Sequence, residues 1–383
     1  MNCEDILSSI MKLRKWIETH NYKAYDPFDG LNSYLHPLTL RSKFLRQGLV
    51  QIVKRSPWNL RPILGINPAQ SSKGIAYIAK GYLWVYKLTG EKNCLEKAKC
   101  CLNWLTEHAD RKYSGLCWGN HFDYQTRGYF LKAGEPTIVW SSLTAQAFVM
   151  AYEVIGDKKY LDIAESTANF ILRDLKHIPV GNGICISYIP GDIVLVHNSN
   201  LLGAALLANV YRYTKREDCL ELARKAVIYA CEHQLPNGAW YYGEEKKFHW
   251  IDNFHTGYNL NAIKDYQEYT GDRSFSESLD KGYSFYRSYF FTEEGIPKYY
   301  YNKLYPIDIQ CISQSIETLV CFGDIDMALK VAQWAIRNMQ APDGHYYFQN
   351  HRFFINKTPM LHWGQGTMFS ALSRLYYSLG GAK

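Results

Sequence analysis

Two kinds of helix alternate along this chain. Six stretches are rich in Ala, Ser and Gly on several faces, at residues 74–86, 141–152, 199–211, 255–266, 309–320 and 364–377. Small residues all round indicate helices that are packed closely on every side. Five of these stretches lead to a glycine, such as Gly90 and Gly156, and glycine is favoured just after a helix end. We refer to these six as the inner helices.

The second kind of helix carries one apolar stripe and one charged face, as helices on the outside of a fold do. Five such stretches follow the first five inner helices, at residues 93–108, 158–175, 217–234, 274–290 and 324–339. A further helix predicted over 39–54 brings this set to six. After each of the five comes a turn, often Asn-Gly or Asp-Gly, and a short aromatic piece that we expect to be strand-like.

This alternation predicts an all-α fold. The repeat is too long for a solenoid of short units, and no alternation of strands with helices suggests a parallel sheet. Six antiparallel hairpins closing into an (α/α)6 barrel, a six-hairpin toroid with aromatic β-hairpin-like loops at one mouth, account for the pattern economically. We expect one domain over residues 1–383, with 1–37 as an N-terminal helix and loop packed on the toroid; Ile6, Ile10, Leu13 and Ile17 give that helix its apolar face.

Composition adds a hint about function. Aromatic residues make up 15% of the chain, with 31 Tyr and 10 Trp, and cavities that stack sugars or bases use such side chains. The net charge of +7 is spread along the chain, which is compatible with an acidic substrate and lacks the basic stripe of a nucleic-acid-binding protein. The ten cysteines show no disulfide framework, and no apolar run has the length of a membrane span. Together with a first segment that lacks a signal-peptide pattern, this predicts a cytoplasmic protein.

The Asn/Asp-Gly-aromatic turns before the small-residue helices resemble those of the six-hairpin toroid of carbohydrate-active enzymes, a group that includes hydrolases, uronate lyases and sugar epimerases. A narrower likeness is to the C-terminal catalytic domain of glucuronyl carbon-five epimerases. Tyr241 and Tyr242 are followed by Trp250-Ile251-Asp252-Asn253-Phe254-His255-Thr256, similar to a motif that opens an inner helix in that family, and the last inner helix carries a similar Gln365-Gly366 pair. The chain departs from the family where Tyr242 is followed by Gly243-Glu244-Glu245 instead of an Asp-Leu-Arg-His run.

The beginnings of the inner helices carry the candidate chemistry. His255, Tyr258 and Asn259 are spaced i, i+3, i+4 and share one helix face. We expect Tyr242, His255 and Tyr258 to transfer protons, with Asp252 orienting His255. The polar and aromatic residues of the six mouths, whose amides, carboxylates and rings suit a polyol, are candidate substrate-binding groups: Trp118, His121, Asp123, Arg127, Trp140, His197, Asn200, Asn259, Asp308, Gln310, His362, Trp363 and Gln365.

On a uronic acid, a positioned base would remove the weakly acidic proton at carbon five, and a cation such as Arg127 would hold the carboxylate. Return of a proton from the opposite face gives epimerisation, and loss of the substituent at carbon four gives a lyase. An acidic oligosaccharide or polysaccharide is therefore the expected partner, met during polysaccharide synthesis or as an imported fragment.

Other interpretations stay open. Asp123, Asp252 and Asp308 offer carboxyl pairs for a glycoside hydrolase, which needs two at roughly 5–10 Å. A non-catalytic glycan-binding protein would use the same rings and amides, and any single Asn, Ser or Asp at a helix start also serves as an N-cap. We expect no cofactor and no metal site, because Cys311 is the only cysteine in a first helical turn and Cys117 the only one in a mouth loop.

Overall fold

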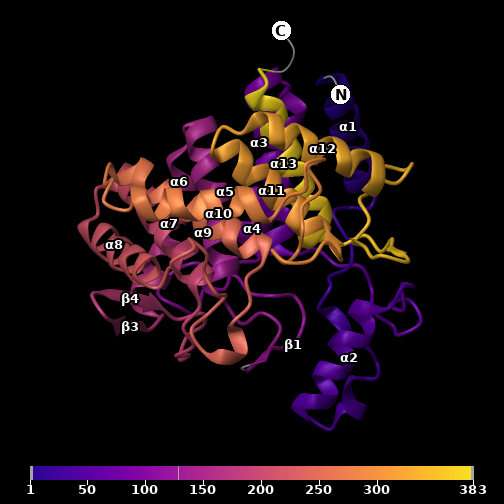
Figure 1. Cartoon of the computed structure of the whole chain (residues 1–383), viewed down its shortest axis with the longest axis horizontal. Coiled ribbons are helices and arrows are strands. Elements are labelled where there is room, and N and C mark those ends of the chain that lie inside the picture. The colour runs from indigo at the N-terminus through magenta and orange to yellow at the C-terminus, as the bar shows by residue number, and fades with distance from the viewer. Residues whose placement is uncertain (1–2, 128, 381–383) are drawn as a thin grey trace.

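Six inner helices form a closed ring in the computed structural model, which describes residues 3–127 and 129–380. They are α3 (Ser72–Thr89), α5 (Ile138–Ile155), α7 (His197–Thr214), α9 (Asn253–Thr270), α11 (Ile309–Cys321) and α13 (Gly366–Ser378). Each packs on the next in chain order, and α13 packs on α3 to close the ring (Figure 1). The predicted all-α class and (α/α)6 barrel are thereby confirmed.

An outer ring surrounds the inner one. Its helices are α4 (Lys92–Glu107), α6 (Lys158–Arg173), α8 (Glu217–Glu232), α10 (Ser276–Tyr289) and α12 (Ile325–Met339), each packed on the inner helix before it. The sixth outer position is taken by α1 (Cys3–Thr19), which packs on α13 and α12. Its apolar stripe of Ile6, Ile10, Leu13 and Ile17 is buried there.

The prediction that the helix over 39–54 belongs to the outer ring is wrong. That segment forms α2 (Lys43–Arg55), which packs on the 3-10 turns η1 (Asp29–Asn32) and η2 (His36–Thr39) and projects from the ring at the lower right of Figure 1. Only Val50 and Val53 of this helix are buried. A stripe of two buried residues is too narrow to cover an inner helix, whereas α1 offers four.

The ends of the inner helices explain the repeated sequence signals. Gly90 and Gly271 adopt left-handed conformations with φ of 68° and 81°, which end α3 and α9, and Lys215 takes the same conformation after α7 with φ of 57°. At the opposite ends, the side chains of Thr137 and Asp252 accept N–H groups of the first turn of α5 and α9. These local bonds fix where α5 and α9 begin, and therefore where their mouth residues lie.

Short antiparallel strand pairs lie among the connections that precede inner helices. They are β1 (Tyr124–Gln125) with β2 (Phe130–Leu131), β3 (His177–Val180) with β4 (Gly183–Ile186), and β5 (Ile307–Asp308) with β6 (Gln349–Asn350) and β7 (Ile355–Asn356). A 3-10 turn, η3 (Lys246–Phe248), precedes α9, and a π-helical turn, η4 (Leu361–Gln365), leads into α13. Of the expected strand-like pieces, residues 182–188 contain all of β4, and the others make isolated bridges.

Among the residues that the structure describes, one helix, α5, is long and apolar enough to cross a membrane by length and composition. It lies in the inner ring between α3 and α7, and most of its surface is buried against other helices. Its apolar character on every face follows from that central position.

Candidate functional site

A cavity of about 300 Å³ opens at the mouth where the inner helices begin. Side chains from α2, from the loop around β1, and from the first turns of α3, α5, α7 and α9 line it, together with η4. Seven residues proposed from the sequence are in its lining: Arg127, Trp140, Tyr242, Asp252, His255, Tyr258 and Trp363. The helix starts thus meet around one concavity.

Aromatic rings make up much of the wall. Tyr242 stacks on Trp250 with ring centroids 4.5 Å apart and planes 11° from parallel. Phe254 meets Trp363 edge-on at 5.2 Å, and Phe28 meets the same indole at 5.4 Å. Such walls offer broad apolar faces with a few polar groups between them, as small-molecule sites do.

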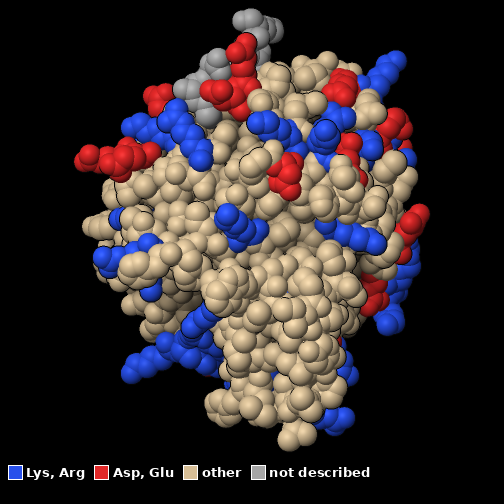
Figure 2. Space-filling model, turned by 90° about the vertical axis from the view of Figure 1, so that its right-hand side faces the viewer, with Lys and Arg blue, Asp and Glu red and all other residues tan. Residues whose placement is uncertain are grey.

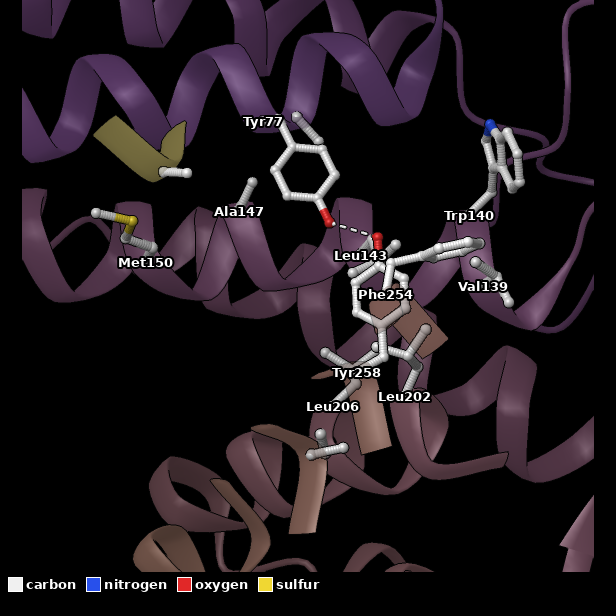
Figure 3. Close-up of a cluster of buried hydrophobic side chains, with 14 of the residues drawn as sticks. Tyr77, Val139, Trp140, Leu143, Ala147, Met150, Leu202, Leu206, Phe254 and Tyr258 are labelled. Atoms are coloured by element: carbon white, nitrogen blue, oxygen red, sulfur yellow. Dashed lines mark hydrogen bonds between the residues drawn. The ribbon is translucent and has the colours of Figure 1, made fainter. Parts of the chain in front are cut away.

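Tyr258 lines the cavity and is buried. Its hydroxyl lies 3.2 Å from the hydroxyl of Tyr77 and accepts a hydrogen bond of 3.2 Å from Nε2 of Gln310. Figure 3 shows the two tyrosines pointing at each other from α3 and α9, with Trp140, Leu143 and Phe254 around them. Burial raises the pKa of Tyr258 above its usual range, so this group is a neutral phenol that can donate a proton or a hydrogen bond.

Asp252 holds His255 in a defined orientation. One carboxylate oxygen accepts the backbone N–H of His255 at 3.0 Å, which caps α9. The other lies 2.7 Å from Nδ1 of His255 and accepts from Nε1 of Trp250 at 2.9 Å. An ionised carboxylate accepts only, so we assign the imidazole proton to Nδ1. The Nε2 atom bonds to no other described residue and is left as an acceptor at the cavity.

Tyr242 lies beside this pair, its ring centroid 4.6 Å from that of His255. Burial, with the nearby Tyr188 next in effect, raises the pKa of Tyr242 well above its usual range. A phenol of this kind keeps its proton at neutral pH and gives it up only to a strongly basic centre, such as a carbanion. His255 and Tyr242 therefore offer complementary acceptor and donor groups.

A lysine that our sequence analysis did not single out lies between the aromatic walls. The ammonium of Lys73 is 5.3, 5.7 and 6.0 Å from the ring centroids of Trp140, Tyr258 and Trp363. Burial lowers the pKa of Lys73 to about 8, and the charge of Asp26 partly opposes that effect. The position of Lys73 in the sequence did hint at a function. A cation in the first turn of a helix interacts unfavourably with the helix dipole, so something other than helix stability explains a lysine there.

Lys54 of α2 reaches the same cavity, its ammonium 4.2 Å from the centroid of Phe28. Burial lowers the pKa of Lys54 to about 8, with Asp308 opposing. At the rim, Arg127 lies over Trp250 at 4.9 Å and donates to the backbone oxygen of Lys247. Arg55 is also in the lining.

The electrostatics of the cavity favour an anion. Four cationic side chains, those of Lys54, Arg55, Lys73 and Arg127, share the lining with one carboxyl group, that of Asp252, within the described part of the chain. The carboxylate already bonds His255 and Trp250. In addition, the inner helices direct the positive ends of their dipoles to this mouth. A ligand with a carboxylate fits this field better than a neutral one.

Behind the wall lie two more proposed residues, His362 and His121. Nδ1 of His362 is in close contact with a carboxylate oxygen of Asp26, and its ring is 5.2 Å from that of Trp140. Burial lowers the pKa of His362, and lowers that of His121 to about 4. Burial alone would raise the pKa of Asp26, but the imidazole contact outweighs it and lowers that pKa. The charge of Asp26 in turn favours the charged form of Lys73.

Several proposed residues bond to the backbone away from the cavity lining. Trp118 is buried and donates from Nε1 to the carbonyl of Leu105, 2.9 Å away. Asp123 accepts the N–H of Ala133 at 2.8 Å, Asn200 bonds backbone groups of Ile186 and Ala226, and Gln365 bonds both backbone groups of Tyr346. These bonds tie loops to helices.

Other proposed residues are placed one layer behind the cavity. Asp308 accepts from Nε1 of Trp363 at 3.0 Å, and burial raises the pKa of Asp308 to about 6. Gln310 holds Tyr258, as described above. His197 bonds Glu244 at 2.7 Å, and Asn259 is buried beneath His255 in a small adjoining space. Of the three aspartates considered as a hydrolytic pair, Asp252 is the one in the lining.

No group of three or more His, Cys, Asp or Glu side chains among the described residues is arranged to hold a metal ion. Cys117 and Cys311 are both buried. Cys117 lies before β1, and Cys311 lies in α11.

Comparisons with known proteins identify the fold. No family model matches the sequence, and no curated protein matches it. Among solved structures, the cellobiose 2-epimerase of Bacillus thermoamylovorans is similar with a TM-score of 0.63 at 13% identity, covering 80% of this chain and 88% of that one. An unsaturated glucuronyl hydrolase specific for heparin also has a TM-score of 0.63, at 15% identity, covering 98% and 96%.

A polysaccharide lyase is similar over 98% of both chains, with a TM-score of 0.61 and 12% identity. These neighbours are toroids of the carbohydrate-active group, and at such low identity the likeness is one of fold. The structural neighbours thus show that the chain has the (α/α)6 toroid fold, and the likeness to glucuronyl carbon-five epimerases stays an expectation from sequence.

Proposed function

We propose that this protein is a carbohydrate-active enzyme that acts on a glycan containing uronic acid, by removing the proton next to the carboxylate. The observation that carries the proposal is the Asp252–His255 pair facing a cavity that holds Lys73 and Arg127. A base and a set of cations in one aromatic cavity suit a substrate with both a sugar ring and a negative charge. The neighbours with carbohydrate substrates support the broad class.

His255 is the proposed base. Its Nε2 would take the proton from carbon five of the uronate, and the electron pair of that C–H bond would pass into the carboxylate to give an enediolate. Asp252 would stabilise the resulting imidazolium through the 2.7 Å contact at Nδ1. General-base catalysis of this kind contributes about 10²–10⁴ in rate.

Lys73 is the proposed partner of the negative charge. Removal of the proton places additional charge on the carboxylate oxygens, and a cation held in a desolvated site stabilises that charge more strongly than it does in water. Burial of Lys73 among Trp140, Tyr258 and Trp363 supplies such a site. In this proposal Arg127 at the rim would clamp a carboxylate or a neighbouring sugar acid.

Tyr242 and Tyr258 are the proposed acids. Both are neutral phenols, because burial raises the pKa of each above its usual range. Either would return a proton to carbon five, which inverts the centre if the proton arrives from the face opposite the one that lost it, or protonate the oxygen that leaves carbon four, which gives an unsaturated sugar. The two outcomes are the epimerase and lyase forms of one mechanism.

The test is incubation with a panel of uronic-acid polymers in heavy water. Deuterium at carbon five, read by mass spectrometry and NMR, is expected for the epimerase form, and an ultraviolet-absorbing double bond for the lyase form. New reducing ends with neither signal would instead indicate a hydrolase, and tight binding without any product would indicate a glycan-binding protein.

A matched pair of variants tests the base. His255→Gln is expected to abolish deuterium uptake or elimination. His249→Gln changes an exposed histidine in the same segment, one that bonds the backbone of Glu244, and is expected to keep activity. Equal activity of the two variants would contradict the proposed role of His255.

A further inference from the structure

An exposed apolar surface surrounds α2. Eight of the fourteen large hydrophobic side chains that are exposed among the described residues fall within residues 34–63. They include Leu40 and Phe44, each 82% exposed, Trp58 at 76% and Ile52 at 63%. We call residues 34–63 the apolar lobe. Its concentration of apolar side chains exceeds what scattered surface residues explain and marks an interaction site.

The outer face of α2 concentrates this character. Phe44, Gly48 and Ile52 recur every fourth residue, so they form one stripe, and Leu45 lies beside it. Val50 and Val53 face the opposite way and are buried against the rest of the lobe. The helix is thus apolar on both faces, and Phe44, Gly48 and Ile52 on its outer face are exposed.

The charges of the lobe have one sign. Arg41, Lys43 and Arg55 are exposed, and the sequence has no Asp or Glu between Asp29 and Glu91. Figure 2 looks toward this side of the molecule, where the lobe projects at the bottom as a mostly uncharged surface with blue side chains beside it. A helix with exposed apolar residues and a basic surround is typical of segments that lie in the interface of an anionic membrane.

We propose that the apolar lobe seats this protein on a bilayer surface rich in anionic lipid. Apolar side chains such as Phe44, Ile52 and Trp58 would enter the headgroup region, and the flanking cations would attract the lipid phosphates. Association of this kind needs no membrane span.

A second copy of the chain fits the lobe less well. Two lobes placed face to face would bring Arg41, Lys43 and Arg55 of both copies together with no acidic residue of the lobe to offset them. Like charges facing each other across an interface disfavour that arrangement. An anionic lipid surface provides the complementary charge.

The lobe is fixed to the ring next to the cavity. Lys43 donates to the backbone oxygen of Arg127 at 2.6 Å, and Gln47 to that of Thr126 at 2.8 Å. Gln51 and Lys54 of the same helix line the cavity. A lobe seated on a membrane would therefore hold the cavity at a fixed position close to the lipid surface.

Vesicle cosedimentation tests the proposal. The full chain is mixed with vesicles of phosphatidylcholine alone, or with about one-third phosphatidylglycerol, at low and high salt. We expect binding to the anionic vesicles that weakens as salt is added, since the cationic part of the attraction is screened. Absence of binding to anionic vesicles, or equal binding to both kinds, would overturn the proposal.

Variants assign the binding surface. The triple change Phe44→Gln, Ile52→Gln and Trp58→Gln is expected to weaken partitioning by about tenfold or more. Tyr289→Gln, which removes a half-exposed aromatic from α10 in the outer ring, serves as the matched control and is expected to bind as the parent does. Circular dichroism and the thermal midpoint establish that each variant is folded.

Light scattering tests whether a second copy of the chain, instead of a membrane, covers the apolar lobe. The parent chain is expected to be of the same oligomeric state as the triple variant. If the parent self-associates and the triple variant does not, a second copy covers the lobe and the membrane proposal fails. Retained vesicle binding by the folded triple variant would contradict it as well.

Discussion

Asp252 has two functions that one substitution separates. Its side chain caps α9 and also fixes the proton of His255 on Nδ1. In Asp252→Asn the amide oxygen still caps the helix, because Asn is as good an N-cap as Asp. The amide cannot accept from Nδ1 and also from Trp250 as the carboxylate does. We expect kcat on the uronate substrate to fall by about 10²–10⁴ with little change in thermal midpoint.

The control is Asp157→Asn, which alters the N-cap of the outer helix α6. It makes the same chemical change at a helix start remote from the cavity and is expected to leave kcat unchanged. An Asp252→Asn enzyme that is fully active, or one that is inactive only because it has unfolded, would contradict the orienting role.

The lowered pKa of Lys73 predicts that kcat/KM depends on pH. Its pKa of about 8 means that the ammonium charge is present below that value and is lost as the pH rises through it. If the charge binds the substrate carboxylate, kcat/KM is expected to fall about tenfold per pH unit above that point, since this ratio reports the free enzyme. In Lys73→Arg the guanidinium stays charged, and the alkaline decline due to this residue is expected to disappear.

Lys54→Arg is the matched variant, because burial lowers the pKa of Lys54 to about 8 too. The profiles of both variants are measured over the same range with the same substrate. A decline that persists in Lys73→Arg and vanishes in Lys54→Arg would transfer the proposed role to Lys54.

Residue spacing indicated the Asp252–His255 pair because its geometry is local: both residues belong to the first turn of one helix. It did not indicate Lys73 or Lys54, whose pKa values depend on rings contributed by distant parts of the chain, such as Trp140 and Phe28. Conversely, Trp118 and Asn200 have the right residue types at helix mouths, but they bond the neighbouring backbone. Residue type alone does not distinguish a side chain that lines the cavity from one that bonds the neighbouring backbone.

At the scale of elements, periodicity identified the inner helices well, since small residues and terminal Gly are properties of each helix by itself. Which helix completes the outer ring was assigned wrongly, because α1 and α2 both show apolar spacing. The distinction lies in tertiary contacts: α1 buries its stripe on α13, while α2 leaves Phe44 and Ile52 exposed. A short buried stripe with apolar residues on both faces is the feature that separates α2 from the other helices.

Close packing between inner helices predicts how replacement of a glycine by alanine changes the stability of the fold. A Cβ at Gly81 of α3 would lie 2.4 Å from the ring of Phe369 on α13, so the ring would have to shift. Gly81→Ala is therefore expected to destabilise the fold by about 1–3 kcal/mol. Gly48→Ala in α2 meets nothing within 4 Å and is expected to stabilise it by up to about 1 kcal/mol through helix propensity.

Urea unfolding of both variants measures the difference in free energy of unfolding, with the same methyl group added in each case. Destabilisation by Gly48→Ala, or none by Gly81→Ala, would show that the closeness of α3 and α13 does not limit side-chain size.

At the scale of the whole molecule, closure of the ring joins the two ends of the described chain. The last inner helix, α13, packs on the first, α3, and is covered on the outside by α1. The mouth of the ring therefore depends on contacts between residues more than three hundred positions apart, such as the 2.7 Å hydrogen bond between Ser9 and Tyr346. An open array of hairpins would lack this dependence, since each unit would contact only its neighbours.

This difference predicts how a defect in α1 spreads. Leu13 is fully buried between α1 and the ring, and Leu13→Ala is expected to cost about 2–5 kcal/mol. In a closed ring the lost stability is shared by all the hairpins. Amide hydrogen exchange should therefore show reduced protection in α7, across the ring from α13, as well as in α13 itself. Met11→Ala, at a half-exposed position of the same helix, is expected to change stability by no more than about 0.5 kcal/mol. Loss of protection confined to α1 and α13, with α7 unchanged, would mean that the hairpins unfold separately and that the ring is not one cooperative unit.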